Sequence, residues 1–193
     1  MPNLTVIIGS TRPGRSGVLI AQWFARRAKD HGGFDVSVAD LAEVGLPLLD
    51  EPNHPRLRQY LHQHTKDWSV IVDAADAFVI VTPEYNFGYP ASVKNALDYL
   101  HQEWQHKPVG FVSYGGIAAG TRAVQQLKQV VTTLRMLPVV DSVSIPFHTQ
   151  VLDQDGTLRA NGVMEQAADA MLDELVRTEA ALRQLRPASR EPA

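Results

Sequence analysis

The sequence has no cysteine among its 193 residues. This absence excludes disulfide bonds, thiolate metal ligands and thiol redox chemistry, so a redox role would have to come from a bound cofactor. Long hydrophobic runs are also missing: no apolar stretch approaches the roughly 20 residues of a membrane-spanning helix, and the amino terminus carries no charged and then apolar leader. We therefore expect a cytoplasmic protein that does not bind membranes.

Neither sign of charge predominates. The 18 Lys and Arg residues against 21 Asp and Glu give a net charge of -3 without a basic stripe, which argues against nucleic-acid binding. The 7 histidines show no metal-ligand spacing. His62 and His64, for example, fall two apart on a predicted helix, where their side chains would not share a face. We expect scattered surface histidines and no metal site.

Short apolar runs alternate with longer segments of helical period, which is typical of a parallel sheet covered on both faces. We expect one domain over residues 1–186 and a flexible tail at 187–193. The predicted strands are residues 4–8, 34–39, 77–82, 109–113 and 138–144, and the predicted helices are residues 16–29, 56–75, 91–103, 121–135 and 162–186, with a proline-rich loop at 42–56. Such an α/β, doubly wound fold binds its ligand at the carboxyl ends of the strands, near a reversal of strand order.

The loop after the first predicted strand is suited to a phosphate. It supplies hydroxyls and forked positive charge from Ser10, Thr11, Arg12, Arg15 and Ser16. The helix that follows adds free N–H groups and the positive end of its dipole. The loop matches neither a P-loop nor a dinucleotide-binding turn, and an ordinary strand-to-helix connection also favours glycine and serine. The two arginines favour a bound anion.

The loop after the third predicted strand combines rigidity with aromatic rings. Pro83, Glu84, Tyr85 and Asn86 open it, and Phe87, Tyr89 and Pro90 complete it. Its polar side chains can hydrogen-bond the edge of a heteroaromatic ring. Taken singly, Tyr85, Phe87 and Tyr89 are better explained as core residues or subunit contacts of a rigid turn. In combination with the phosphate-type loop, they favour a bound ligand.

The loop after the fourth predicted strand is small, with Ser113, Tyr114, Gly115 and Gly116 at its start. Such a segment allows a flat ligand to lie against the main chain, and Tyr114 offers a ring face or a hydroxyl. The alternative is a glycine-rich entry into the next helix, capped by Thr121. In the predicted fold all three loops converge on one crevice.

Together these segments resemble the NAD(P)H-dependent FMN reductase family, which has a flavodoxin-like fold with strand order 2-1-3-4-5. The resemblance spans most of residues 4–145. The stretches that carry it are Gly9-Ser10-Thr11-Arg12 with Ser16, Pro83-Glu84-Tyr85-Asn86 with Pro90 and Lys94-Asn95-Ala96-Leu97-Asp98, and Ser113-Tyr114-Gly115-Gly116.

The resemblance implies a role for each loop in binding FMN. Ser10, Arg12 and Ser16 are expected to hold the phosphate, with Thr11 and Arg15 beside them. The segment 83–86 is expected to border the ribityl chain and the isoalloxazine ring, and Ser113, Gly115 and Gly116 to flank the opposite edge. Many relatives have an asparagine shortly after the second serine of the first loop, where this chain has Gly17-Val18, so the phosphate contacts there are expected to differ.

The resemblance also implies the activity. NADPH or NADH would pass a hydride to N5 of the flavin, and the electrons would then go to a small-molecule acceptor such as free flavin, a quinone, an azo dye or a metal oxyanion. The flavin carries this chemistry, so no side chain is predicted to be catalytic. Arg15 is open to three interpretations: contact with the 2′-phosphate of NADPH, a second FMN contact, or a solvated residue at the helix start.

Two further expectations concern assembly and class. The helix at 91–103, with Lys94, Asp98, Tyr99 and Trp104, is a plausible face for a homodimer, and a homotetramer of two dimers is possible in this family. A flavodoxin-type electron carrier and a flavin-binding regulatory protein are the alternatives. Electron carriers of the flavodoxin type are usually strongly acidic, so the net charge of -3 argues against that alternative.

Overall fold

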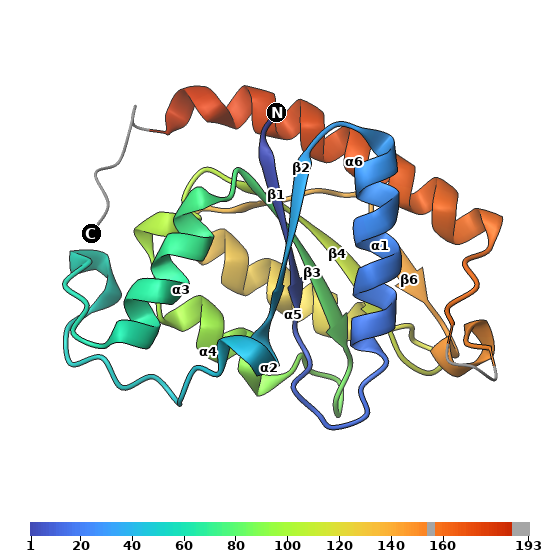
Figure 1. The fold of residues 1–193 in the computed structure, drawn as a ribbon, viewed down its shortest axis with the longest axis horizontal. Coiled ribbons are helices and arrows are strands. Elements are labelled where there is room, and N and C mark those ends of the chain that lie inside the picture. The colour runs from blue at the N-terminus through green and yellow to red at the C-terminus, as the bar shows by residue number, and fades with distance from the viewer. Residues whose placement is uncertain (154–156, 187–193) are drawn as a thin grey trace.

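A parallel β-sheet lies at the centre of the computed structural model, which describes residues 1–153 and 157–186 (Figure 1). Its strands are β1 (Asn3–Ile8), β2 (Asp35–Asp40), β3 (Ala77–Pro83), β4 (Pro108–Tyr114), β5 (Leu137–Pro138) and β6 (Val143–Ile145). Their order is β2-β1-β3-β4-β5, and β6 also pairs with β4. The expected flavodoxin-like order is therefore confirmed. The tail predicted at 187–193 lies outside the described residues.

The fifth predicted strand is wrong as a continuous element. Val109 of β4 pairs with Pro138, and Val112 pairs with Val143. Val109 and Val112 are three residues apart on β4, whereas their partners Pro138 and Val143 are five residues apart. The chain therefore loops outward between β5 and β6, and Val140 is 85% exposed. Proline lacks the N–H that would continue the ladder at this point.

Helices cover both faces of the sheet. They are α1 (Gly17–His31), α2 (Leu41–Val44), α3 (Gln63–Ala74), α4 (Ala91–Asp98), α5 (Thr121–Thr133) and α6 (Gly162–Leu182), with 3₁₀ turns η1 (Pro55–Leu57), η2 (Gln102–Trp104), η3 (His148–Val151) and η4 (Arg183–Leu185).

The helix predicted at 56–75 is interrupted because Arg58, at φ 51°, adopts a left-handed conformation and ends η1. The short helix α2 overlaps the start of the segment predicted as a loop at 42–56. Thr121 is the first residue of α5 and Gly120 is its N-cap, so the predicted cap is off by one residue.

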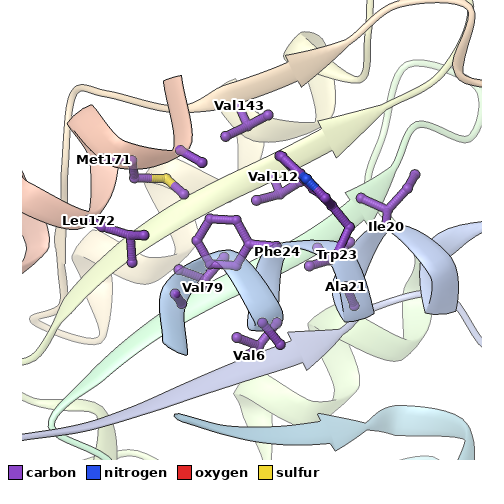
Figure 2. Close-up of a cluster of buried hydrophobic side chains, with 14 of the residues drawn as sticks. Val6, Ile20, Ala21, Trp23, Phe24, Val79, Val112, Val143, Met171 and Leu172 are labelled. Carbon is purple, nitrogen blue, oxygen red and sulfur yellow. The ribbon is translucent and has the colours of Figure 1, made fainter. Parts of the chain in front are cut away.

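One face of the sheet packs against α1 and α6. Phe24 from α1 points toward Met171 and Leu172 from α6 over the valines of the sheet, and Trp23 belongs to the same cluster (Figure 2). The opposite face packs against α3, α4 and α5, with Trp68, Phe78 and Trp104 among its fully buried side chains. The predicted apolar stripe Val93, Ala96, Leu97 and Leu100 is buried there. Both cores keep the carboxyl ends of β1, β3 and β4 together at one edge.

The aromatic part of the predicted dimer face is wrong. Tyr99 and Trp104 are both 0% exposed. The Trp104 indole donates to the carbonyl of Leu97, 3.1 Å away, and the Tyr99 hydroxyl donates to Asp50 at 2.9 Å. These rings belong to the core because α4 ends at Asp98 and the chain then turns inward. The polar residues of the predicted face, Lys94 and Asp98, pair at 2.6 Å and are partly exposed on this helix.

The prediction that the His62 and His64 side chains lie apart is also wrong. His62 precedes α3 in an extended conformation, so the two rings stack, with centroids 5.2 Å apart. Within residues 1–153 and 157–186, no three His, Asp or Glu side chains converge as a metal site would require. Over the same residues, no helix combines the length and the apolar character needed to cross a bilayer.

Candidate functional site

The three loops singled out in the sequence meet at one cavity of about 460 Å³, at the carboxyl ends of β1, β3 and β4. The cavity is lined by Arg12, Pro13, Gly14, Arg15, Ser16, Pro83, Glu84, Tyr85, Tyr114, Gly115, Gly116, Phe147, His148 and Thr149. Gly9 allows this convergence, because a Cβ there would lie 2.6 Å from Val93 and 3.0 Å from the carbonyl of Val81. The first loop therefore crosses β3 and α4 at a distance that only glycine permits.

Four of the predicted site residues lie apart from the cavity wall. Ser10 is fully buried beneath it, and the Ser113 hydroxyl is buried without a hydrogen-bond partner among the described residues. Thr11 faces a neighbouring cavity of about 220 Å³ between the first loop, α2 and α4. Asn86 lies at the tip of the second loop. The other nine predicted residues line the main cavity.

Hydroxyl groups connect the three loops. The Ser10 hydroxyl lies 2.7 Å from the Tyr85 hydroxyl and also interacts with the hydroxyl of Tyr114. Burial raises the pKa of Tyr114, and the interaction with Ser10 only partly opposes this rise. The Tyr114 hydroxyl reaches the start of α1, where a Cβ on Gly17 would lie 2.6 Å from it. Tyr114 thus occupies the space beside the position where relatives were expected to have asparagine.

The two arginines of the first loop differ in their pairing. The Arg15 guanidinium lies 2.5 Å from Asp40, and the exposed fractions of the two side chains are 18% and 9%. Asp40 also accepts a hydrogen bond from Ala42 at the start of α2. Arg12 is exposed, and its guanidinium has no ion pair or side-chain partner in the part of the chain that is described. The unpaired cation at the cavity is therefore Arg12.

The second loop is held in place by α5. Tyr85 and Gly88 exchange backbone hydrogen bonds of 2.8 and 2.9 Å, and the turn between them places Asn86 and Phe87 at φ 51° and 71°. This left-handed conformation is unfavourable for phenylalanine. Arg122 compensates from α5, since its guanidinium lies 3.7 Å from the centroid of the Phe87 ring and pairs with Glu84.

Sequence reasoning missed the fourth wall of the cavity, which comes from residues after β6. The backbone N–H groups of Phe147 and His148 donate to the carbonyls of Gly116 and Gly115, each at 3.2 Å. The His148 ring packs edge-on against Tyr114 with centroids 5.2 Å apart. The sequence does predict a fifth strand, and the residues that follow its carboxyl end could have been expected to reach the cavity. Arg122 carried no such signal, because it points to the site from the first turn of a helix.

This arrangement suits a ligand with an anionic end and a flat, polar ring system. Arg12 and the start of α1 provide compensation for a phosphate. One oxygen of the Glu84 carboxylate and the Ser113 hydroxyl are buried without partners among the described residues, so they are available as hydrogen-bonding groups. The free space beside Gly116 admits a flat group close to the main chain. The residues present therefore fit FMN.

The comparisons with known proteins concern the family and the fold of this chain. The chain is 42% identical over 149 residues to an NAD(P)H-dependent FMN reductase of Schizosaccharomyces pombe, covering 75% of this chain and 74% of that protein. It is 26% identical over 173 residues to an FMN-dependent NADPH-azoreductase of Staphylococcus saprophyticus, covering 89% and 92%. The flavoenzyme FerB of Paracoccus denitrificans superposes with a TM-score of 0.74 at 19% identity, covering 94% and 98%, which supports the fold. Residues 2–150 match the family model described as NADPH-dependent FMN reductase, so this chain belongs to that family.

Proposed function

We propose that this protein binds FMN in the 460 Å³ cavity and uses it to transfer electrons from NADPH or NADH to a small-molecule acceptor. The observation that carries the proposal is the convergence of three loops around one unpaired arginine, Arg12, in a chain of the FMN reductase family. The site is open to solvent, which suits a cofactor whose redox partners arrive and leave in turn.

The proposed binding roles follow from charge and position. Arg12 and Ser16, at the start of α1, would bind the phosphate, and Ser10 would support them from below through Tyr85. Arg15 would act as a neighbour, because its charge is already compensated by Asp40. The segment 83–86 would border one edge of the flavin, and Ser113 with Tyr114, Gly115 and Gly116 the other.

FMN, when bound, supplies a ring that accepts a hydride at N5 and later releases two electrons. The chain's own residues would bind this ring, orient it and leave one face accessible. No side chain that lines the cavity is assigned a catalytic role. The Glu84–Arg122 pair and the Ser10–Tyr85 bond keep the second loop in a single position, which is the main protein contribution to orientation.

The proposed acceptors are free flavin, quinones and azo compounds. The support for azo compounds is the similarity to the staphylococcal azoreductase. The support for a broad range is the opening of the cavity to solvent. We make no choice between NADPH and NADH, since the pairing of Arg15 with Asp40 removes the residue that sequence analysis offered for a 2′-phosphate.

Purification followed by anaerobic titration tests the proposal. The protein should show flavin absorbance after incubation with FMN, and addition of NADPH or NADH should bleach it within the mixing time of an assay. Bound flavin that stays oxidised would favour the alternative of an electron carrier or a regulatory protein. If FMN does not bind at saturating concentration, the proposed function is wrong.

We also propose that the protein forms a homodimer, with a homotetramer as the larger form. The proposed contact surface is the rim of the cavity, because Tyr99 and Trp104 are buried in the core. Phe87, Ile117 and Phe147 are 61%, 83% and 46% exposed around it, and a second copy would cover them. Light scattering tests this, with Ile117→Glu expected to shift the protein towards monomer; a monomeric wild type would contradict it.

Two other expectations are carried forward as proposals. Residues 1–186 would form one FMN-binding domain, because both cores flank the same sheet. Limited proteolysis should therefore yield no stable fragment much shorter than this. A cytoplasmic location would be tested by cell fractionation.

A further inference from the structure

The carboxylate of Glu84 uses its two oxygens differently. The side chain is 8% exposed, and Oε1 accepts a hydrogen bond of 2.6 Å from Nε of Arg122 and also pairs with its terminal nitrogen. Oε2 is buried, has no hydrogen-bond partner among the described residues, and belongs to a side chain that lines the main cavity. A buried carboxylate oxygen without a donor is unfavourable, so this position favours a ligand that brings an N–H or O–H group.

Arg122 fixes the direction of that carboxylate. Its guanidinium is held between Glu84 and the face of the Phe87 ring, 3.7 Å from the ring centroid. Gln126, one turn later on α5, donates to the carbonyl of Phe87 at 3.2 Å. Both the base and the tip of the second loop therefore contact α5. Because Arg122 occupies Oε1, Oε2 is the carboxylate oxygen available to a ligand.

We propose that Glu84 Oε2 accepts a hydrogen bond from the imide N–H of the flavin ring, and that Arg122 is a positioning residue that acts through Glu84. This inference rests on the proposed function. The imide N–H is the single N–H donor of the oxidised flavin ring, and a carboxylate is its strongest available acceptor. The ribityl hydroxyls are the competing donors, and the experiment distinguishes them.

A fixed negative charge beside the ring has a second consequence. Reduction adds negative charge to the flavin, so Glu84 disfavours the reduced form and Arg122 favours it. Glu84→Gln should therefore move the midpoint potential of bound FMN to a more positive value, and Arg122→Gln should move it to a more negative one. A loop that is merely loosened would not give opposite signs.

The first test needs no variant of the protein. Apoprotein is titrated with FMN and with 3-methyl-FMN, in which a methyl group replaces the imide hydrogen, and binding is followed by quenching of flavin fluorescence. Wild type should bind the methylated flavin at least about tenfold more weakly, since the carboxylate loses a charge-assisted hydrogen bond. Glu84→Gln should bind the two flavins within about threefold of each other.

The control variant is Arg177→Gln, which removes an arginine from an exposed pair with Glu174 on α6, far along the chain from the loops. It should behave as wild type in both assays. The inference would be overturned if Glu84→Gln kept the full discrimination against 3-methyl-FMN. It would also be overturned if wild type bound FMN less than about twofold more tightly than 3-methyl-FMN, because Oε2 would then be assigned to a ribityl hydroxyl. Potentials that shift in the same direction for both variants would overturn the role of Arg122. Wild type that does not bind FMN at all would instead refute the proposed function.

Discussion

The guanidinium of Arg15 lies 2.5 Å from the carboxylate of Asp40, whereas Arg12, three residues earlier in the same loop, has no such partner among the described residues. Asp40 ends β2 and also caps α2 through the backbone N–H of Ala42. The pair therefore connects the first loop to the neighbouring strand. Of two arginines that look equivalent in the sequence, one contributes structure and the other offers net charge to a ligand.

The first prediction separates these roles. Arg12→Gln should weaken FMN binding by about tenfold or more, because a charge-assisted hydrogen bond to the phosphate is lost. Binding of riboflavin, which has no phosphate, should change by less than about twofold. Fluorescence titration of both flavins measures the effect. Arg26→Gln, at an exposed position on α1, is the matched control for charge. Equal losses for FMN and riboflavin would mean that Arg12 does not contact the phosphate.

A second prediction concerns the buried carboxylate of Glu103. This side chain is 0% exposed and accepts hydrogen bonds from Tyr60 and Ser69 at 2.9 and 2.8 Å, beside Arg58 at 3.2 Å. Glu103→Ala should lower the free energy of unfolding by about 3 kcal/mol, because the buried hydroxyls of Tyr60 and Ser69 lose their acceptor and Arg58 keeps only its ion pair with Asp73. Urea denaturation measures this. FMN affinity of the folded fraction should be unchanged, since the network lies away from the cavity; a loss of less than about 1 kcal/mol would show that the network is dispensable.

The sequence predicts the fold well where periodicity and burial agree. β3 and β4 are buried throughout and β1 is buried except at Asn3, and the predicted stripe from Val93 to Leu100 faces the core as spaced. The failures occur where a single residue decides. Arg58 adopts a left-handed conformation that ends a helix, and the residues between Pro138 and Val143 loop outward from the sheet. Neither event leaves a periodic signal.

The same distinction holds for the site. Loops that follow strands were found because parallel strands deliver their carboxyl ends to one edge. Arg122 was missed because it reaches the site from a helix, and its partner Glu84 lies 38 residues earlier. The stacking of His62 on His64 was missed because it depends on where α3 begins. Contacts between distant segments are set by packing, which a single sequence does not display.

A third prediction uses the pKa of Asp50. Burial acts to raise this pKa, but hydrogen bonds with His64 and Tyr99 outweigh it, so the pKa is lowered from its ordinary value of 3.8. A carboxylate with a lower pKa in the folded state stabilises the protein above its unfolded pKa, and this stabilisation is lost as the pH falls through the folded pKa. Asp50→Asn should therefore lower the melting temperature near neutral pH.

The pH dependence provides the control for Asp50. The difference in melting temperature between wild type and Asp50→Asn should be constant above about pH 5 and should shrink as the pH falls below 3.8, where the unfolded carboxylate is protonated. Thermal unfolding followed by circular dichroism measures it. Asp67→Asn, at an exposed position on α3, is the matched variant. A difference that is independent of pH down to about pH 2 would show that lost packing, not charge, accounts for the effect.

The last prediction tests the contact between the first and third loops. A Cβ at position 17 would lie 2.6 Å from the Tyr114 hydroxyl, well inside ordinary contact. Gly17→Ala should therefore displace Tyr114 and cost about 1–3 kcal/mol of stability, with weaker FMN binding because Ser10 loses its orientation. Tyr114→Phe removes the hydroxyl, so the double variant Gly17→Ala with Tyr114→Phe should be more stable than the sum of the single effects predicts. A double-mutant cycle in urea measures the coupling between the two positions. Strict additivity would show that the start of α1 and the end of β4 adjust independently.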